Sequence, residues 1–326
     1  MSREIQVSVL VPSYQHESFV AQAVESVLEQ SGVDLEVLAI DDGSTDGSVA
    51  RLRAIGDDRL QVIAQENRGL SRTLNRGLAL ARGRWVKMLP SDDLLEPGAL
   101  ARQLQMAGED DLVVFSLPTV VDADNCPLSD PAPQAWFDLE APDVPSLRRS
   151  LVARNPLCAP GALFLRDAAL EAGGFDPSLR IAQDYDLWLR LLECGGARHL
   201  PERLVRVRWH GGNQSGVVTS SSESERAYAL VGTLVRCGMD WWAGQFGNQG
   251  RVALAEALVA SGLREAIPFA RSALVAHRAA GGSLVRSEEL RALLDEAPEL
   301  IRGGAWRGDG ETEAGEPPPR GRGEGR

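Results

Sequence analysis

Apolar residues form short continuous runs that alternate with helical repeats over roughly the first 90 positions of the chain. Runs rich in Val, Ile and Leu predict buried strands, and apolar positions that recur every three or four residues predict the helices between them. Pro12 follows the first run, and we expect it to end that strand because proline cannot donate to a sheet. The strand–helix–strand order favours a parallel sheet. The predicted strands cover 6–11, 35–40, 60–63 and 85–89, and the predicted helices cover 20–28, 48–55 and 70–81.

The pattern changes further along the chain. From about residue 112 short apolar runs alternate with proline-rich loops, and the elements that can be predicted there are a helix over 184–193 and a strand over 204–209. Towards the C-terminus Ala, Leu, Arg and Glu dominate, and glycines interrupt the helical repeat, which is typical of a small helical unit. The final residues are rich in Gly, Pro, Glu and Arg and have little to bury, which indicates disorder. We predict a sheet domain, a helical C-terminal unit and a disordered tail over 1–218, 219–302 and 303–326.

Composition limits the class of protein. The 326 residues are 44% hydrophobic, which is enough for one large α/β domain with a smaller addition. A net charge of -12 argues against nucleic acid as a partner, because a nucleic-acid backbone requires a cationic surface. The sequence has no apolar run long enough to cross a bilayer and no signal-peptide pattern. We therefore expect a cytoplasmic protein, either free or held peripherally at the inner face of the membrane.

Acidic residues follow the predicted strands. Asp42 comes after the second strand, and Asp92 and Asp93 come after the fourth. The carboxyl ends of parallel strands share one edge of a sheet, where ligands of doubly wound folds bind. Two adjacent carboxylates repel each other, and Mg²⁺ or Mn²⁺ together with a diphosphate relieves that repulsion. The pair therefore predicts a metal and diphosphate site, with a helix cap as the alternative for each of these acids.

A further carboxylate, Asp184, lies at the start of the amphipathic helix predicted over 184–193. Backbone N–H groups at a helix start can hold a carboxylate rigidly, so Asp184 is our candidate for a general base. Asp186 is a competitor, but two residues along a helix it points in a different direction. A simple capping role for Asp184 is the alternative.

Basic and aromatic side chains supply further candidates. His210 follows the predicted strand over 204–209 and precedes two glycines, so its ring could approach a metal or a phosphate, although a structural role is the alternative. Arg72 belongs to a basic group over 68–84 that could hold a phosphate, although a solvated helix face has the same pattern. Tyr14, after the first strand, could stack on a base or pack in the core. His16 has no comparable setting.

Taken together, these motifs closely resemble the family 2 glycosyltransferases of GT-A fold over roughly the first 215 residues. The resemblance rests on the order and spacing of the elements rather than on any one of them. They are Val9 to Tyr14, Asp41 to Asp46, Asn67 to Ser71 with Leu74 to Gly77, Ser91 to Asp93, Gly173 to Asp176, Gln183 to Leu191, and Arg208 to His210 with Asn213 and Ser215.

The resemblance implies a Rossmann-like, doubly wound mixed sheet and an inverting, metal-dependent transfer of a sugar from a nucleotide-diphosphate sugar to an acceptor hydroxyl. The cofactor would be Mn²⁺ or Mg²⁺, and a UDP sugar is the default donor. The acceptor is unknown; a lipid-linked glycan in cell-surface polysaccharide or glycoconjugate synthesis fits the family. The resemblance would place Pro12, Tyr14 and Asp42 at the nucleotide. It would place Asp92 and Asp93 in the DXD site, with Asp93 as the metal ligand. Asp184 would be the base, and His210 would contact the metal or the diphosphate.

Two departures from the family pattern keep an alternative open. Relatives often carry Asp where Pro90 stands and Glu where Gln183 stands. A non-catalytic nucleotide-sugar-binding or scaffold protein of the same fold therefore remains a second hypothesis. A sugar nucleotidyltransferase would need a glycine-rich phosphate loop after the first strand, which this chain lacks. The pair Trp241 and Trp242 suggests either contact with a membrane-bound acceptor or packing in a core.

Overall fold

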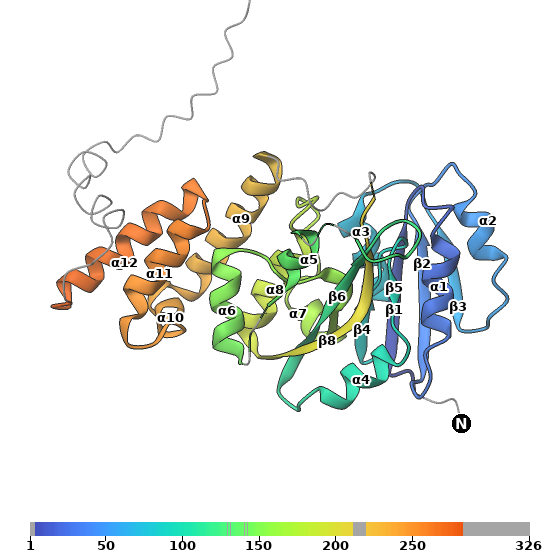
Figure 1. Cartoon of the computed structure of the whole chain (residues 1–326), viewed down its shortest axis with the longest axis horizontal. Coiled ribbons are helices and arrows are strands. Elements are labelled where there is room, and N and C mark those ends of the chain that lie inside the picture. Colours follow the sequence, from blue (N-terminus) through green and yellow to red (C-terminus); the bar gives the residue numbers. More distant parts are fainter. Residues whose placement is uncertain are drawn as a thin grey trace, which may run out of the picture. The chain divides into compact units, whose positions relative to one another are not determined.

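The computed structural model describes residues 4–210, apart from 129, 131, 140 and 142, together with residues 220–282. They belong to one compact unit, which spans Met1–Leu284. An eight-stranded sheet organises this unit, with the strand order β3-β2-β1-β4-β7-β6-β8-β5 (Figure 1). The strands are β1 Val7–Ser13, β2 Leu35–Asp41, β3 Leu60–Ala64, β4 Trp85–Met88, β5 Leu94–Leu95, β6 Asp111–Val121, β7 Ala162–Leu165 and β8 Gly196–Arg208.

The first half of the sheet is parallel, as predicted: β1 lies between β2 and β4, and β3 follows β2. The prediction that Pro12 ends the first strand is wrong, because β1 continues through Ser13. Pro12 is tolerated because its nitrogen faces the β4 side, where pairing has already ended. The bond from Leu89 N–H to the Leu10 carbonyl closes that ladder.

The second half makes the sheet mixed, which confirms the predicted class. β7 is antiparallel to β4 and β6, whereas β6 and β8 are parallel to each other. β8 begins at Gly196, well before the strand predicted over 204–209. Its first part carries Arg198, His199 and Glu202 and therefore has no apolar run to detect, but backbone pairing with β6 forms the strand nonetheless.

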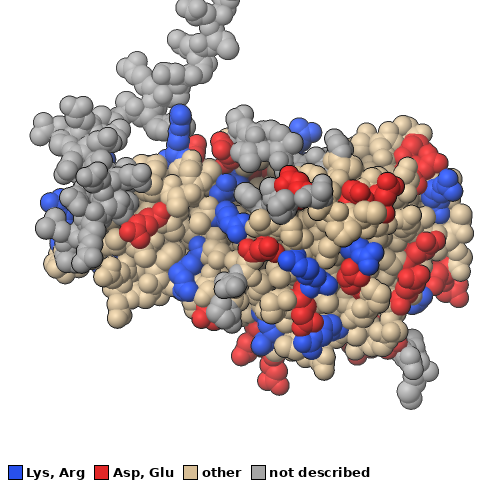
Figure 2. Space-filling model, in the orientation of Figure 1, with Lys and Arg blue, Asp and Glu red and all other residues tan. Residues whose placement is uncertain are grey.

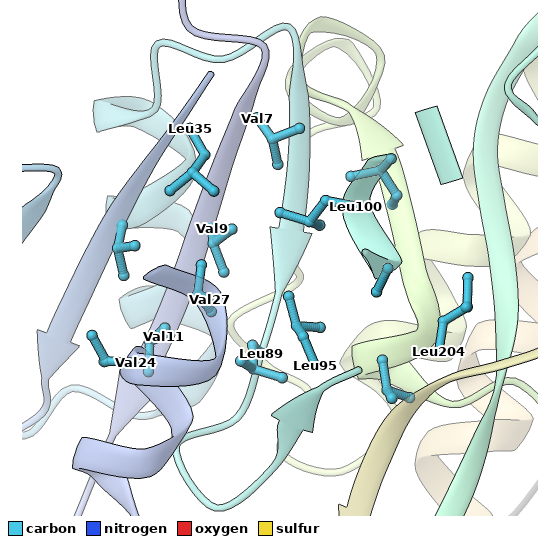
Figure 3. Close-up of a cluster of buried hydrophobic side chains, with 14 of the residues drawn as sticks. Val7, Val9, Val11, Val24, Val27, Leu35, Leu89, Leu95, Leu100 and Leu204 are labelled. Atoms are coloured by element: carbon cyan, nitrogen blue, oxygen red, sulfur yellow. The ribbon is translucent and has the colours of Figure 1, made fainter. Parts of the chain in front are cut away.

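Helices cover both faces of the sheet. In α1, Val20, Val24 and Val27 are fully buried, and Figure 3 shows Val24 and Val27 beside Val9 and Val11 of β1. Burial of one such valine stabilises the fold by about 1.5–3 kcal/mol. The α-helices up to the end of the sheet are α1 Val20–Leu28, α2 Ser48–Arg53, α3 Leu70–Leu80, α4 Ala99–Met106, α5 Ala132–Phe137, α6 Val144–Ala153, α7 Arg166–Glu171 and α8 Gln183–Cys194.

Four further helices follow within 220–282, as the composition predicts: α9 Ser220–Cys237, α10 Met239–Gly244, α11 Gly250–Ala260 and α12 Ile267–Ala279. α9 packs against α8, and α11 packs against α6 (Figure 1). Gly238, Gly262 and Gly281 follow helix ends with positive φ angles, a conformation that favours glycine. The proposed boundaries at 218 and 302 stay predictions, and the predicted disordered tail lies outside the described residues.

Trp241 and Trp242 pack against each other in α10, and Trp241 is partly buried. Trp242 is fully buried and meets the edge of Trp241, whose ring lies 4.8 Å from the guanidinium carbon of Arg148 in α6. On the face shown in Figure 2, acidic and basic side chains are interspersed. In the part of the chain that the structure describes, no helix combines the length and apolar character that a bilayer crossing requires.

Candidate active site

The loops after β1 and β2 are joined by hydrogen bonds at the carboxyl edge of the sheet. The Gln15 side chain exchanges hydrogen bonds with Thr45, and the backbone N–H of Gln15 donates to the Ser44 hydroxyl. The His16 N–H donates to the Ser48 hydroxyl at 3.0 Å. Gln15 has a φ of 56°, a strained backbone that these bonds support. The two loops therefore hold His16 in a defined position.

The Asp42 carboxylate accepts three hydrogen bonds from other residues of the chain. Its Oδ1 accepts hydrogen bonds from the Gln65 side chain at 2.7 Å and the Arg68 N–H at 2.8 Å, and its Oδ2 accepts the Gly69 N–H at 2.9 Å. These donors lie directly before α3. Asp42 thus ties the end of β2 to the loop between β3 and α3, and its role at a nucleotide stays a prediction.

The turn after β4 places Asp92 and Asp93 in different surroundings. The Asp93 carboxylate is buried and accepts the backbone N–H of Arg208 at 3.0 Å. Burial, reinforced by the neighbouring charge of Asp92, raises the pKa of Asp93 well above its usual range. The carboxylate of Asp92 instead contacts His210, with Oδ2 and Nε2 3.2 Å apart. Asp92 is thus the member of the pair whose contact with His210 the structure shows, and the role of Asp93 as metal ligand stays a prediction.

Three possible ligands gather at this point. Donor atoms of His16, Asp92 and His210 all lie within 4.8 Å of one another. His16 was not expected from the sequence, because residue 16 lies in a loop far along the chain from the other two. The Ser91 hydroxyl contacts the Nδ1 atom of His16 at 2.7 Å, an outer contact of the kind that orients metal-binding histidines. Two imidazoles and one carboxylate suit a divalent transition-metal ion such as Mn²⁺.

Phe19 and Arg208 pack beside this cluster. The Phe19 ring stacks on His210 with a centroid separation of 5.1 Å, and the guanidinium carbon of Arg208 lies 5.0 Å from the same ring. Arg208 is fully buried and donates from Nη1 to the Asp92 carbonyl at 2.6 Å. Because the Arg208 side chain contacts the Asp92 carbonyl and the Arg208 N–H contacts the Asp93 carboxylate, Arg208 fixes the end of β8 against the turn after β4.

Asp184 lies in the first turn of α8, one residue inside a helix that begins at Gln183. Desolvation raises the pKa of its carboxyl to about 6, although hydrogen bonds from the Tyr185 N–H and the Asn155 side chain favour the charged form. A carboxylate with that pKa can accept a proton near neutral pH. Asp186 is committed elsewhere, since its Oδ2 accepts two hydrogen bonds from Arg190.

The buried Cys158 connects the two acidic regions. Burial raises the pKa of its thiol, and the carboxylates of Asp93 and Asp184 raise it further. Both acids therefore lie within electrostatic range of one side chain, although they come from the turn after β4 and from α8. The predicted convergence of Asp42, Asp93 and Asp184 on one crevice stays a prediction.

The remaining predicted residues differ in their exposure. Tyr14, directly after β1, is 50% exposed and free to meet a planar ligand, whereas Pro12 is buried within β1. Arg72 lies exposed on α3. Asn213 and Ser215 fall outside the described residues. Sequence reasoning missed Phe19, and it included Arg208 only as part of the family motif, without its contacts to Phe19 and to the Asp92 carbonyl.

Comparison with known proteins gives one family. A model described as "Glycosyl transferase family 2" matches residues 8–171, about half of the chain. Chondroitin synthase of Escherichia coli is 30% identical over 213 residues, which cover 64% of this chain and 30% of that protein. The chain thus spans less than a third of the length of this relative.

Solved structures share the fold. S. aureus TarS 1-349 in complex with UDP-GlcNAc has a TM-score of 0.63 at 20% identity, covering 82% of this chain and 74% of that one. The mannosyltransferase PcManGT from Pyrobaculum calidifontis, in complex with GDP-Man and Mn²⁺, has a TM-score of 0.54 at 22% identity, covering 92% and 81%. Both likenesses extend beyond the stretch that the family model matches.

Proposed function

Since the chain belongs to glycosyl transferase family 2, we propose that it transfers a sugar from a nucleotide-diphosphate sugar to an acceptor hydroxyl, with inversion at the anomeric carbon. The observation that carries this proposal is the cluster of His16, Asp92 and His210 at the carboxyl edge of the sheet. Asp184, whose pKa is raised to about 6, lies on the neighbouring helix α8. A cation site and a proton acceptor are the two groups that this reaction requires.

The residues present fit a divalent cation. Asp92 and His210 would hold Mn²⁺ or Mg²⁺, and His16 would complete the set; the mixed nitrogen and oxygen donors favour Mn²⁺. When bound, the ion would neutralise negative charge on the diphosphate leaving group. Asp93, buried and bonded to the Arg208 backbone, would support the turn that carries Asp92.

Asp184 supplies the proton chemistry. Its carboxylate takes the proton of the acceptor hydroxyl as that oxygen attacks the anomeric carbon. The bond between this carbon and the diphosphate oxygen breaks, and both of its electrons leave with the nucleoside diphosphate. Attack opposite the leaving group inverts the anomeric configuration. A base with a pKa near 6 is charged at neutral pH and ready for this step.

The nucleotide would occupy the region between β1 and β2. Tyr14 is exposed enough to stack on a base, and Pro12 lies at the end of the strand beneath it. A carboxylate offers about four acceptor positions, so Asp42, which accepts three hydrogen bonds within the chain, retains capacity for one donor of a base or ribose. Arg72 would contact phosphate from α3.

The neighbours guide the choice of substrate. Two of them were solved in complex with UDP-GlcNAc and with GDP-Man, so we propose UDP and GDP sugars as the first donors to test, with a UDP sugar as the default. Similarity to chondroitin synthase suggests a role in polysaccharide or glycoconjugate synthesis. A cytoplasmic site of action, with peripheral contact to a lipid-linked acceptor, remains part of the proposal.

Donor hydrolysis tests the proposal without a known acceptor, because water can take the place of the acceptor hydroxyl. The protein is incubated with UDP-GlcNAc or GDP-mannose and Mn²⁺, and released nucleoside diphosphate is measured alongside donor binding by calorimetry. We expect slow release by the parent protein. Asp184→Asn should lower the release rate by about 10²-fold or more while leaving the donor Kd within about twofold, since the base contributes to the reaction step.

A matched control is Asp167→Asn, which removes an exposed carboxylate from α7 and should change neither quantity. Binding of a donor without any release, in the parent protein and with Mn²⁺ present, would instead support the non-catalytic alternative. Equal release by Asp184→Asn and the parent would show that another group accepts the proton.

A further inference from the structure

One carboxylate of the C-terminal helices contacts the chain just before the proposed base. Glu225 lies on α9, and its Oε2 accepts the backbone N–H groups of Arg180, Ile181 and Ala182 at 3.0, 2.7 and 2.9 Å. Three donors on one oxygen form a backbone nest filled by a carboxylate. Asp184 follows two residues after the last of these donors.

The position of this contact is unusual for a helix start. Ala182 is the N-cap of α8 and has no side-chain acceptor, and the N–H groups that Glu225 accepts belong to this residue and to the two residues before it. Glu225 supplies the acceptor from a different helix. Its negative charge also lies at the positive end of the α8 dipole, where an anion is stabilised.

The same helix α9 holds the far end of α8. Glu193, near the C-terminus of α8, accepts hydrogen bonds from the Thr233 hydroxyl and from Arg236, with an Arg236 Nη2 to Oε1 distance of 2.7 Å. Both ends of the helix that carries Asp184 are therefore bonded to α9. Between them, α8 is fixed by packing, and the Tyr185 hydroxyl donates to the Leu151 carbonyl of α6 at 2.6 Å.

We propose that Glu225 is a positioning residue for the transfer reaction, which sets the location of the Asp184 carboxylate through the first turn of α8. This inference rests on the proposed role of Asp184 as the base. Loss of the three hydrogen bonds would free residues 180–182 and allow that first turn to shift. A displacement of about 1 Å in a reacting group can cost about 10²-fold in rate, so a distant carboxylate can control the reaction without contacting the substrate.

Three variants test this role in the full chain. Glu225→Ala removes the acceptor, Glu225→Gln keeps an acceptor oxygen but removes its charge, and Glu223→Ala is the control, since Glu223 is an exposed acid on the same helix. Nucleoside diphosphate release from UDP-GlcNAc or GDP-mannose with Mn²⁺ gives kcat and KM. We expect Glu225→Ala to lower kcat about 10- to 100-fold with donor KM within about twofold. Glu225→Gln should recover most of the rate, and Glu223→Ala should match the parent.

Two further readouts separate positioning from a general loss of structure. In the protein without donor, Glu225→Ala should raise amide hydrogen exchange at residues 180–182 and leave β1 and β2 unchanged. In an Asp184→Asn background, Glu225→Ala should lower the residual release by less than about twofold, because effects that act through one group are not additive. If Glu225→Ala does not fold, Glu225→Gln carries the kinetic and exchange comparisons.

The possible failures are distinguishable. If Asp184→Asn is inactive while Glu225→Ala retains the parent kcat, the positioning role is wrong and the base assignment stands. If Asp184→Asn releases nucleoside diphosphate at the parent rate, the base assignment is wrong. The positioning role of Glu225 is then wrong as well, because it depends on that assignment. An equal, large effect of Glu225→Ala in both backgrounds would show that Glu225 acts independently of Asp184 and would also overturn the proposal.

Discussion

At the scale of single residues, neighbouring acids of the same type acquire different properties from their surroundings. Asp93 is buried beside the Arg208 backbone, and the pKa of its carboxyl is raised, whereas Asp92 reaches His210. Two adjacent aspartates in the sequence indicate a cation, but they do not indicate which of them binds it. The direction of each side chain depends on the turn after β4 and on where β8 ends.

The His16 ring shows a second limit of sequence reasoning. A lone histidine in a loop carries no metal signal, and its ligand partners lie at positions 92 and 210. Only the parallel pairing of β1 with β4 and the return of β8 bring these residues together. The predicted candidates Asp92 and His210 do lie in contact, because each follows a strand of the same sheet.

The raised pKa of Asp184 gives a pH-dependent prediction. The base must be deprotonated to accept a proton, and desolvation raises the pKa of its carboxyl to about 6. The kcat for nucleoside diphosphate release should therefore be constant above about pH 7 and fall about tenfold for each pH unit below 6. To test this, kcat is measured with saturating donor at about eight pH values between about 4.5 and 8. A rate that stays constant down to pH 5 would contradict the assignment.

At the scale of elements, the N-terminal strands and helices were predicted to within about two residues because their apolar periods are regular. The first part of β8 was not predicted, since its polar residues hide the apolar pattern of a strand.

β4 contains a buried charged side chain. Lys87, which is the single lysine in the sequence, is fully buried within this short strand and donates from Nζ to the Gln103 side chain of α4 at 2.7 Å.

The buried Lys87 should make stability depend on pH. Desolvation lowers the pKa of its amine from 10.5 to about 7 in the folded chain, whereas the unfolded chain keeps the proton up to about 10.5. Unfolding therefore takes up a proton between these values, and this group makes the free energy of unfolding rise with pH across that window. Lys87→Met should reduce the slope by up to about 1.4 kcal/mol per pH unit.

Urea unfolding of the parent and Lys87→Met at pH 7, 8 and 9 measures this slope. Lys87→Met also leaves the Gln103 side-chain carbonyl without its donor, which lowers the free energy of unfolding at every pH. This loss does not affect the comparison, because only the change of the free energy of unfolding with pH is compared between the two proteins. Parallel curves for the two proteins would show that Lys87 keeps its ordinary pKa in the fold.

At the scale of the whole molecule, the chain combines a sheet that carries the candidate site with helices that support it. The change in composition near residue 219 predicted a helical unit, and its boundary at 218 stays a prediction. The described helices α9 to α12 belong to the same compact unit as the sheet. The reason lies in the buried face of α9, where Ala227, Leu230 and Leu234 are covered, and in its bonds to both ends of α8. Such long-range packing has no local signature, so the sequence could predict the helices but not their attachment to the proposed base.

The central claim is that separate loops of this fold converge on one cation site. Anomalous X-ray diffraction from crystals soaked with Mn²⁺ and UDP tests it most directly, because the metal is located without reference to activity. We predict one strong peak within about 2.0–2.3 Å of donor atoms of Asp92 and His210, with His16 beside it. A peak coordinated by Asp93 instead, or Mn²⁺ bound only away from the turn after β4, would contradict the account.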